Sequence, residues 1–140
     1  MDVGVFAFIK NKEDKILLVK DVTRQQLWTL PGGGPDFQEL MPDALVREVK
    51  EETGCGIKLG QLLGIFSQKK TQGIVILFDA HIESGEPTSD GVETAACEFF
   101  SYEKILEMRE QIKPAQLSMI SQVISAQVYP VYNHFISPQS

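Results

Sequence analysis

The 140-residue sequence has no long hydrophobic run, no surplus of basic residues, and only two cysteines and two histidines. No apolar stretch approaches the ~20 residues that a transmembrane helix needs, so we expect no association with a membrane. The start of the chain, Met1-Asp2-Val3-Gly4, lacks the basic region of a secretory signal. We therefore expect a cytoplasmic protein.

The few cysteines and histidines exclude several kinds of site; they are Cys55, Cys97, His81 and His134. None of them falls at metal-ligand spacing, so we do not expect zinc. Although one disulfide is arithmetically possible, two small buried thiols in a reducing compartment are the favoured interpretation. No G-K-[S/T] follows a glycine run, which excludes a P-loop.

Acidic residues outnumber basic residues by 19 to 13, which gives a formal net charge of −6. This balance argues against a broad nucleic-acid surface, and we expect no stable nucleic-acid complex. The acids gather in two segments, since residues 36–52 carry a net charge of −4 and residues 83–98 one of −5. So much negative charge in a small domain needs either solvent or cations.

Length and composition are those of one globular domain, residues 1–140. Hydrophobic patterns predict strands at 3–9, 15–20, 27–30, 57–66, 73–82 and 95–101, and helices at 41–53, 102–111 and 114–128. We expect the first two strands to form a hairpin. The run Gly-Gly-Gly-Pro at 32–35 is expected to have no regular structure.

The helix predicted at 41–53 has suitable residues at both ends. Pro42 and Asp43 suit its first turn, and Gly54 suits the position just past its end. Its expected buried stripe consists of Leu45, Val46 and Val49. In the last helix one apolar face belongs to the core or, alternatively, to a homodimer contact; it consists of Leu117, Ile120 and Ile124.

Three glutamates lie on one face of the helix at 41–53. Glu48, Glu51 and Glu52 are three and four residues apart, which is one helical turn. These carboxylates could simply form an acidic helix face that is exposed to solvent. Otherwise their negative charge has to be balanced, and Arg47 supplies only one positive charge. A divalent cation such as Mg²⁺ or Mn²⁺ prefers such oxygen ligands. With a glycine-rich loop just before the helix, the set suits attack of water on a phosphoanhydride.

The segment from Gly33 to Cys55 resembles the Nudix hydrolase box, G-x5-E-x7-R-E-U-x-E-E-x-G-U, in which U is a bulky aliphatic residue. All fixed positions are matched, by Gly33, Glu39, Arg47, Glu48, Glu51, Glu52 and Gly54. Val49 fills the first aliphatic position, whereas Cys55 occupies the second. In positions that are not fixed, Asp36 stands where Glu is common and Gln38 where Gly is common.

The resemblance extends beyond the box. Residues 28–33 resemble the strand and loop that enter it, and residues 93–105 resemble a late strand that leads into a helix. The fold implied is the α/β (α+β) class of this family, an α/β/α sandwich around a mixed, partly antiparallel sheet. In some members a glutamate near the start of the late strand joins the metal site, and Glu93 matches that position.

The resemblance also implies roles for the matched residues. The metal ligands would be three carboxylates and one backbone carbonyl, from Glu48, Glu51, Glu52 and Gly33, holding Mg²⁺ or Mn²⁺. One of these carboxylates, or Glu93, would act as base toward the attacking water, and the choice among them stays open. Arg47 would hold the glutamates in place, and Glu39 would brace the loop against the helix.

The implied activity is metal-dependent cleavage of a phosphoanhydride in a nucleoside triphosphate, or in a nucleoside diphosphate linked to another group. Aromatic residues that could stack on a base are Phe6, Phe8, Phe66, Phe78, Tyr129 and Tyr132. The alternative is a non-catalytic Nudix-like domain that binds a nucleotide metabolite and regulates a partner. Turnover that is lost in Glu52→Gln would distinguish the enzyme from the binding domain.

Overall fold

The computed structural model describes residues 2–23, 25–68, 73–92 and 94–126. The strands in this part of the chain are β1 (Val3–Ile9), β2 (Ile16–Asp21), β3 (Trp28–Thr29), β4 (Gly32–Gly33), β5 (Gly56–Gln68), β6 (Gly73–Ser84) and β7 (Thr94–Phe100). Its helices are α1 (Met41–Thr53), α2 (Tyr102–Glu107), the one-turn 3-10 helix η1 (Arg109–Gln111) and α3 (Pro114–Ala126). None of these helices is long and apolar enough to span a membrane.

The strands form two sheets. The four-stranded sheet has the order β4-β1-β6-β5, in which β1 and β6 are parallel and the other neighbours are antiparallel. The three-stranded sheet has the order β3-β2-β7 and is antiparallel throughout. The chain therefore crosses from the first sheet to the second after β1, and again after β6.

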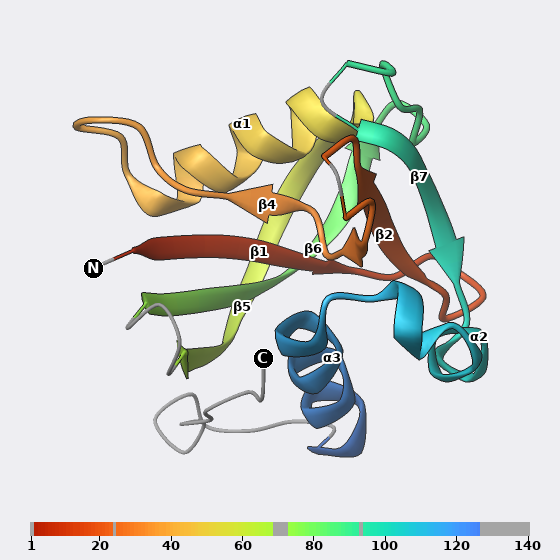
Figure 1. Ribbon diagram of the computed structural model, residues 1–140. Coiled ribbons are helices and arrows are strands. Elements are labelled where there is room, and N and C mark those ends of the chain that lie inside the picture. The colour runs from red at the N-terminus through yellow and green to blue at the C-terminus, as the bar shows by residue number, and fades with distance from the viewer. Residues whose placement is uncertain (1, 24, 69–72, 93, 127–140) are drawn as a thin grey trace.

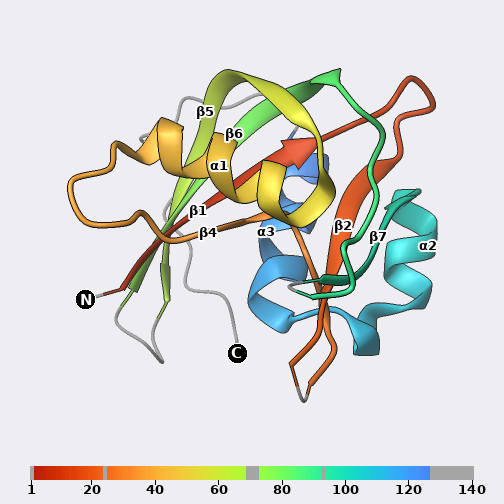
Figure 2. The same ribbon diagram turned by 90° about the horizontal axis from the view of Figure 1, so that it is seen from above.

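Helices cover both sides of the four-stranded sheet. α1 lies on one side of β1, β5 and β6, and α3 lies on the opposite side (Figures 1 and 2). The expected α/β/α sandwich with a mixed, partly antiparallel sheet is confirmed, with the strands divided between two sheets. The side chains of β1 serve both layers, because alternate residues of a strand point to opposite faces. Val5 and Ala7 belong to the same core cluster as Leu45 of α1, whereas Phe8 belongs to the same cluster as Met119 of α3.

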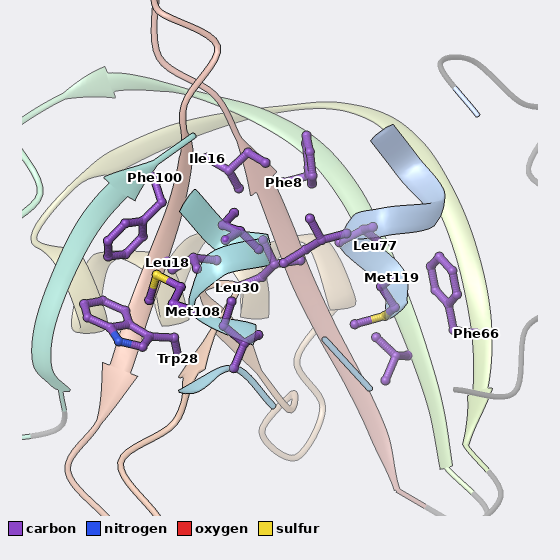
Figure 3. Close-up of a cluster of buried hydrophobic side chains, with 14 residues drawn as sticks. Phe8, Ile16, Leu18, Trp28, Leu30, Phe66, Leu77, Phe100, Met108 and Met119 are labelled. Carbon is purple, nitrogen blue, oxygen red and sulfur yellow. The ribbon is translucent and has the colours of Figure 1, made fainter. Parts of the chain in front are cut away.

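The larger core cluster lies between the sheets and the helices α2 and α3 (Figure 3). Trp28 packs edge-to-face on Phe100, with ring centroids 4.9 Å apart. Met119 of α3 lies in the same cluster as Phe66 of β5 and Leu77 of β6 (Figure 3). The expected core face of α3 is confirmed; Ile120 is fully buried, and Leu117 and Ile124 are partly buried against the same cluster.

α1 has the predicted bounds and most of the predicted features. Pro42 and Asp43 are in its first turn, and Gly54 ends it in the left-handed conformation with φ +77°. The predicted buried stripe is wrong at Val46, which is 37% exposed. Each residue turns a helix by about 100°, so Val46 leaves the face that Leu45 and Val49 share. Ala44 and Thr53 complete the buried stripe instead.

Two expectations about strands are wrong. β1 and β2 are not paired as a hairpin, because only a single bridge between Lys10 and Ile16 joins them. β1 is apolar on both faces and already has a partner at each edge, β4 and β6, as a central strand does. The glycine run does contain regular structure, since Gly32 and Gly33 pair with Phe6 and Val5 of β1.

The helix predicted at 102–111 is also corrected. α2 ends at Glu107, and Met108, with φ −100° and ψ 23°, leads into η1. Ile105 and Met108 are both buried, so the tighter last turn keeps the apolar side chains on the core. α3 starts at Pro114 as predicted, and residues 127 and 128 of the predicted helix lie outside the described residues.

Candidate active site

β4 lies close to α1 because its two residues have no side chains. A Cβ on Gly32 would collide with the carbonyl of Val5 and lie 2.7 Å from Cα of Phe6, and Gly32 has φ +152°. A Cβ on Gly33 would lie 2.7 Å from Cδ of Glu48. Only glycine at both positions lets the carboxylates of α1 reach the backbone of the strand.

Two of the three predicted glutamates contact this glycine pair. Oε1 of Glu52 accepts a hydrogen bond from the N–H of Gly32 at 2.8 Å. The carboxylate of Glu48 lies against Gly33, because a Cβ on this glycine would be only 2.7 Å from Cδ of Glu48. Glu51 is farther out, with a side chain that is 41% exposed. The helix face that the sequence predicts is therefore present, with Glu48 and Glu52 on its inner side.

Arg47 connects the carboxylates to the loop that precedes α1. Its Nε and Nη2 bind the two carboxylate oxygens of Glu39 at 2.9 and 3.0 Å, the forked geometry of a strong charged pair. Its Nη1 donates to Glu48 at 3.1 Å and to Glu51 at 3.2 Å. Its Nη2 also donates to the carbonyl of Gly34 at 3.2 Å. One guanidinium thus holds three glutamates and a loop carbonyl.

Glu39 braces the loop against the helix, as the sequence predicts. Besides its pair with Arg47, it accepts the N–H of Asp36 at 2.9 Å. Hydrogen bonds from Arg47, and then from the backbone of Asp36, lower the pKa of Glu39 below its ordinary value of 4.5. Hydrogen bonds to Glu39 are also the largest cause that raises the pKa of Arg47. Arg47 is therefore a permanent positive charge at the centre of this network.

The donor set suits a hard divalent cation. Carboxylate oxygens of Glu48 and Glu52 lie beside the backbone of a glycine strand, and such oxygens are the ligands that Mg²⁺ and Mn²⁺ prefer. Among the described residues, no group of three or more His, Cys, Asp and Glu side chains is arranged to hold a metal. Glu51 instead turns to Arg47. The predicted ligand set, Gly33, Glu48, Glu51 and Glu52, stays a prediction.

Several predicted residues lie outside the described part of the chain. Glu93, the further candidate base, is one of them, and its role stays a prediction. Tyr129, Tyr132 and His134 are also outside it. Cys55, in the second aliphatic position of the motif, is fully buried as expected, whereas Cys97 is only half-buried; both are free thiols.

A small cavity of about 180 Å³ lies between the start of β1, the start of β6 and the start of α3. Phe6, one of the aromatic candidates, lines it, whereas Phe8 and Phe66 are buried in the core. Gln116 of α3 also lines the cavity and was not singled out by the sequence. Gln116 precedes Met119 by three residues and Ile120 by four, so helical spacing would have predicted that it lies on the same buried face.

Known proteins share the sequence pattern that builds this site. Residues 1–123 match the NUDIX domain family. The chain belongs to the Nudix family. The match covers the glycine strand β4, the whole of α1, and the cavity-lining residues of β1, β6 and α3.

Two curated relatives have different activities in their names. A Bacillus subtilis (strain 168) protein, provisionally described as an 8-oxo-dGTP diphosphatase, is 40% identical over 100 residues, 70% of this chain and 65% of the relative. A Mus musculus protein, diphosphoinositol polyphosphate phosphohydrolase 3-alpha, is 44% identical over 63 residues, 45% of this chain and 38% of the relative. The matches thus span less than two thirds of either relative's length.

A solved structure shows the same fold. The MutT protein from Methanosarcina mazei Go1 is 27% identical and superposes with a TM-score of 0.76, over 90% of this chain and 94% of that one. The Nudix family and its fold are thus established for this chain.

Proposed function

We propose that this Nudix domain is a divalent-metal-dependent hydrolase that cleaves a phosphoanhydride bond in a nucleotide. The observation that carries the proposal is the contact between α1 and the glycine strand, where Glu48 lies against Gly33 and Glu52 accepts the N–H of Gly32. Carboxylates held at a bare backbone, with a fixed arginine beside them, are suited to binding a metal and to activating water. The provisional diphosphatase relative supports the same class of reaction.

In this proposed reaction, different residues would bind the metal, accept a proton and position the carboxylates. Glu48, Glu51 and Glu52, with the carbonyl of Gly33, would hold Mg²⁺ or Mn²⁺, which when bound supplies positive charge for the phosphate oxygens. One of these carboxylates, or Glu93, would accept the proton of the attacking water. Arg47 would keep Glu48 and Glu51 in place from behind, because its five donors are already directed at loop and helix acceptors.

The proposed substrate is a small nucleotide, either a nucleoside triphosphate or a nucleoside diphosphate linked to another group. The names of the two relatives point to two different classes of substrate, since one is named for 8-oxo-dGTP and the other for diphosphoinositol polyphosphates. The cavity beside Phe6 is lined by an aromatic side chain and by one basic residue, Lys113, and an aromatic wall suits a nucleobase. We further propose a reducing, cytoplasmic setting, consistent with the two free thiols.

The test is a panel of substrates with Mg²⁺ and with Mn²⁺. It includes canonical and 8-oxo nucleoside triphosphates, ADP-ribose, a dinucleoside polyphosphate and a diphosphoinositol polyphosphate, with released phosphate measured through a coupled phosphatase. We expect turnover of a nucleotide and loss of that turnover in Glu52→Gln. Nucleotide binding without turnover would instead identify a binding domain and contradict the proposal, as would turnover that persists in Glu52→Gln.

A further inference from the structure

Two of the three buried polar side chains in the described part of the chain lie where α1 meets β7. Thr53, the last residue of α1, is fully buried, and Thr94, the first residue of β7, is 2% exposed. The third, Gln116, belongs to α3. A buried hydroxyl is favourable only where it forms hydrogen bonds, so the partner of each threonine indicates what that threonine does.

The hydroxyl of Thr94 binds the backbone of a predicted metal ligand. Its Oγ1 donates to the carbonyl oxygen of Glu52 at 2.9 Å, between positions 42 residues apart. Glu52 is in the last turn of α1, where the carbonyls of a helix have no partner within the helix. β7 begins beside this end of α1 (Figure 1). The bond therefore holds the last turn of α1 against the start of β7.

Glu52 is thus held at its side chain and at its main chain. Its carboxylate oxygen Oε1 accepts the N–H of Gly32 in β4 at 2.8 Å, and its carbonyl is bound by Thr94 in β7. β4 and β7 belong to different sheets. The distance of the carboxylate from the glycine strand therefore depends on where the last turn of α1 lies between the two sheets.

Thr94 has a fixed backbone from which its hydroxyl can act. It pairs with Asp21 of β2, and its carbonyl accepts the N–H of Gly91 at 3.1 Å. The loop before β7 forms a second bond to the end of α1, from the N–H of Thr88 to the carbonyl of Thr53 at 2.9 Å. Because the donor of that second bond is the backbone, only the bond at position 94 needs a hydroxyl side chain.

We propose that Thr94 is a positioning residue whose hydroxyl keeps Glu52 at the distance from β4 that metal binding needs. The inference rests on the proposed function, in which Glu52 is a metal ligand, and it adds a residue outside the fixed positions of the motif. Replacing a residue that holds a metal ligand in place changes metal affinity or activity by about 10–100-fold in typical cases. Thr94 would act in this way through the main chain of Glu52.

The amide of Gly32 reports the position of Glu52 without metal, substrate or turnover. Thr94→Val removes the hydroxyl and keeps the branched shape that suits a strand, so the fold should survive. In this variant we expect the N–H of Gly32 to exchange with solvent about tenfold faster than in wild type, as measured by NMR. The N–H of Ala7, bonded to the carbonyl of Pro31 at 2.9 Å, is the internal reference and should keep its rate.

Binding of Mn²⁺ alone gives a second readout. Metal-free protein would be titrated with Mn²⁺ while the free ion is followed by EPR. We expect about tenfold weaker binding in Thr94→Val and wild-type binding in Thr94→Ser, which keeps the hydroxyl. Thr88→Val is the matched control, because it removes a hydroxyl that donates to the loop carbonyl of Glu86 and leaves the backbone bond to Thr53 in place. This control should bind Mn²⁺ as the wild type does.

Several outcomes would overturn the role of Thr94. One is exchange that is unchanged at Gly32 in Thr94→Val, or accelerated equally at Gly32 and Ala7, as a merely structural role predicts. Another is Mn²⁺ affinity that is unchanged in Thr94→Val or lowered equally in Thr88→Val. The serine variant is decisive even if Thr94→Val does not fold, because weaker Mn²⁺ binding in Thr94→Ser than in wild type contradicts the proposal.

The role of Thr94 and the proposed function can fail separately. A protein that hydrolyses nucleotides, with exchange at Gly32 and Mn²⁺ affinity independent of Thr94, keeps its function and loses the positioning residue. A protein in which both readouts depend on Thr94, but which hydrolyses no nucleotide, keeps the positioning residue and loses the enzyme. A wild-type protein that binds no Mn²⁺ contradicts both.

Discussion

Arg47 balances the negative charge of the site at the level of single residues. Its side chain is 27% exposed and contacts Glu39, Glu48 and Glu51 within 3.2 Å. Without it these carboxylates would repel one another across one helical turn and one loop. The same contacts keep Arg47 turned toward the protein, so the structure supports a positioning role for it rather than contact with substrate.

Gly33 should be intolerant of even one methyl group. In Gly33→Ala the new Cβ would lie 2.7–3.0 Å from the carboxylate of Glu48 and push it from its place. We expect kcat of nucleotide hydrolysis to fall about 10²-fold, since small displacements of catalytic groups have effects of that size. Steady-state kinetics would measure this. Gly34→Ala is the matched control, because its Cβ approaches only the carbonyl of Val3, at 3.3 Å; an equal loss in both variants would contradict the role of Glu48.

The pair between Glu39 and Arg47 should make stability depend on pH in a defined direction. The pKa of Glu39 is lower in the folded protein than its ordinary value of 4.5. Its contribution is therefore complete above pH 4.5 and is lost as the pH falls through the lower, folded pKa. We expect Glu39→Gln to lower the urea midpoint at pH 7, and the difference from wild type to shrink below pH 4.5.

Urea unfolding between pH 7 and pH 2.5 would check this expectation. Glu110→Gln, at an exposed position in η1, is the control and should follow the wild type at every pH. A difference between Glu39→Gln and wild type that stays constant over the whole range would mean that the ion pair with Arg47 does not stabilise the fold.

At the level of single residues, most of the candidate site could be predicted from the fixed spacing of the motif. The seven matched positions of the motif include the arginine network and both glutamates that meet β4. Helical spacing could have placed Gln116 on the buried face of α3, but its hydrogen bond to Leu30, 86 positions away, could not be predicted from local sequence. The N–H of Asp36 that Glu39 accepts likewise depends on the shape of a loop.

At the scale of elements, the rotation of α1 decides which carboxylates face the glycine strand. Leu45 and Val49 are fully buried on the sheet side, which fixes the helix about its axis. Glu48 and Glu52 then face β4, whereas Val46 is partly exposed and Glu51 lies farther out, paired with Arg47. The packing of apolar residues thus sets the direction of the acidic ones.

The orientation of α1 can be tested by truncating two neighbouring side chains and comparing the losses in unfolding free energy. Leu45→Ala removes a fully buried side chain and should cost about 2–5 kcal/mol of unfolding free energy. Val46→Ala, at a position that is 37% exposed, should change it by about 0.5 kcal/mol or less. Chemical denaturation would measure both. Equal losses would contradict the helix orientation seen here.

Local pattern predicted the type and place of most elements but not all partners. α1 was predicted to the residue because proline, aspartate and glycine mark its ends. The hairpin of β1 and β2 was wrong because sequence proximity favoured it, whereas β1 is a central strand between β4 and β6. The pairing of glycines in β4 was missed because it depends on Phe6 and Val5, more than twenty positions earlier.

For the molecule as a whole, an edge strand of the four-stranded sheet carries the backbone that the glutamates of α1 contact. β4 is one of the two edge strands of that sheet, and the carboxylates of Glu48 and Glu52 lie against it. On our proposed function a nucleotide would place its phosphates beside α1 at this strand. The overall sandwich was predicted through the family resemblance, whereas the division into two sheets was not.

The metal dependence of hydrolysis tests the central claim most directly. Initial rates on the preferred nucleotide would be measured against Mg²⁺ concentration, after removal of metal with EDTA, for wild type, Glu52→Gln and Glu110→Gln. Gln at position 52 keeps an oxygen for the N–H of Gly32, so the fold should survive. We predict no turnover without metal, restoration by Mg²⁺, a loss of about 10²-fold or more in Glu52→Gln, and wild-type rates in Glu110→Gln. Turnover that needs no metal, or that is undiminished in Glu52→Gln, would contradict the account.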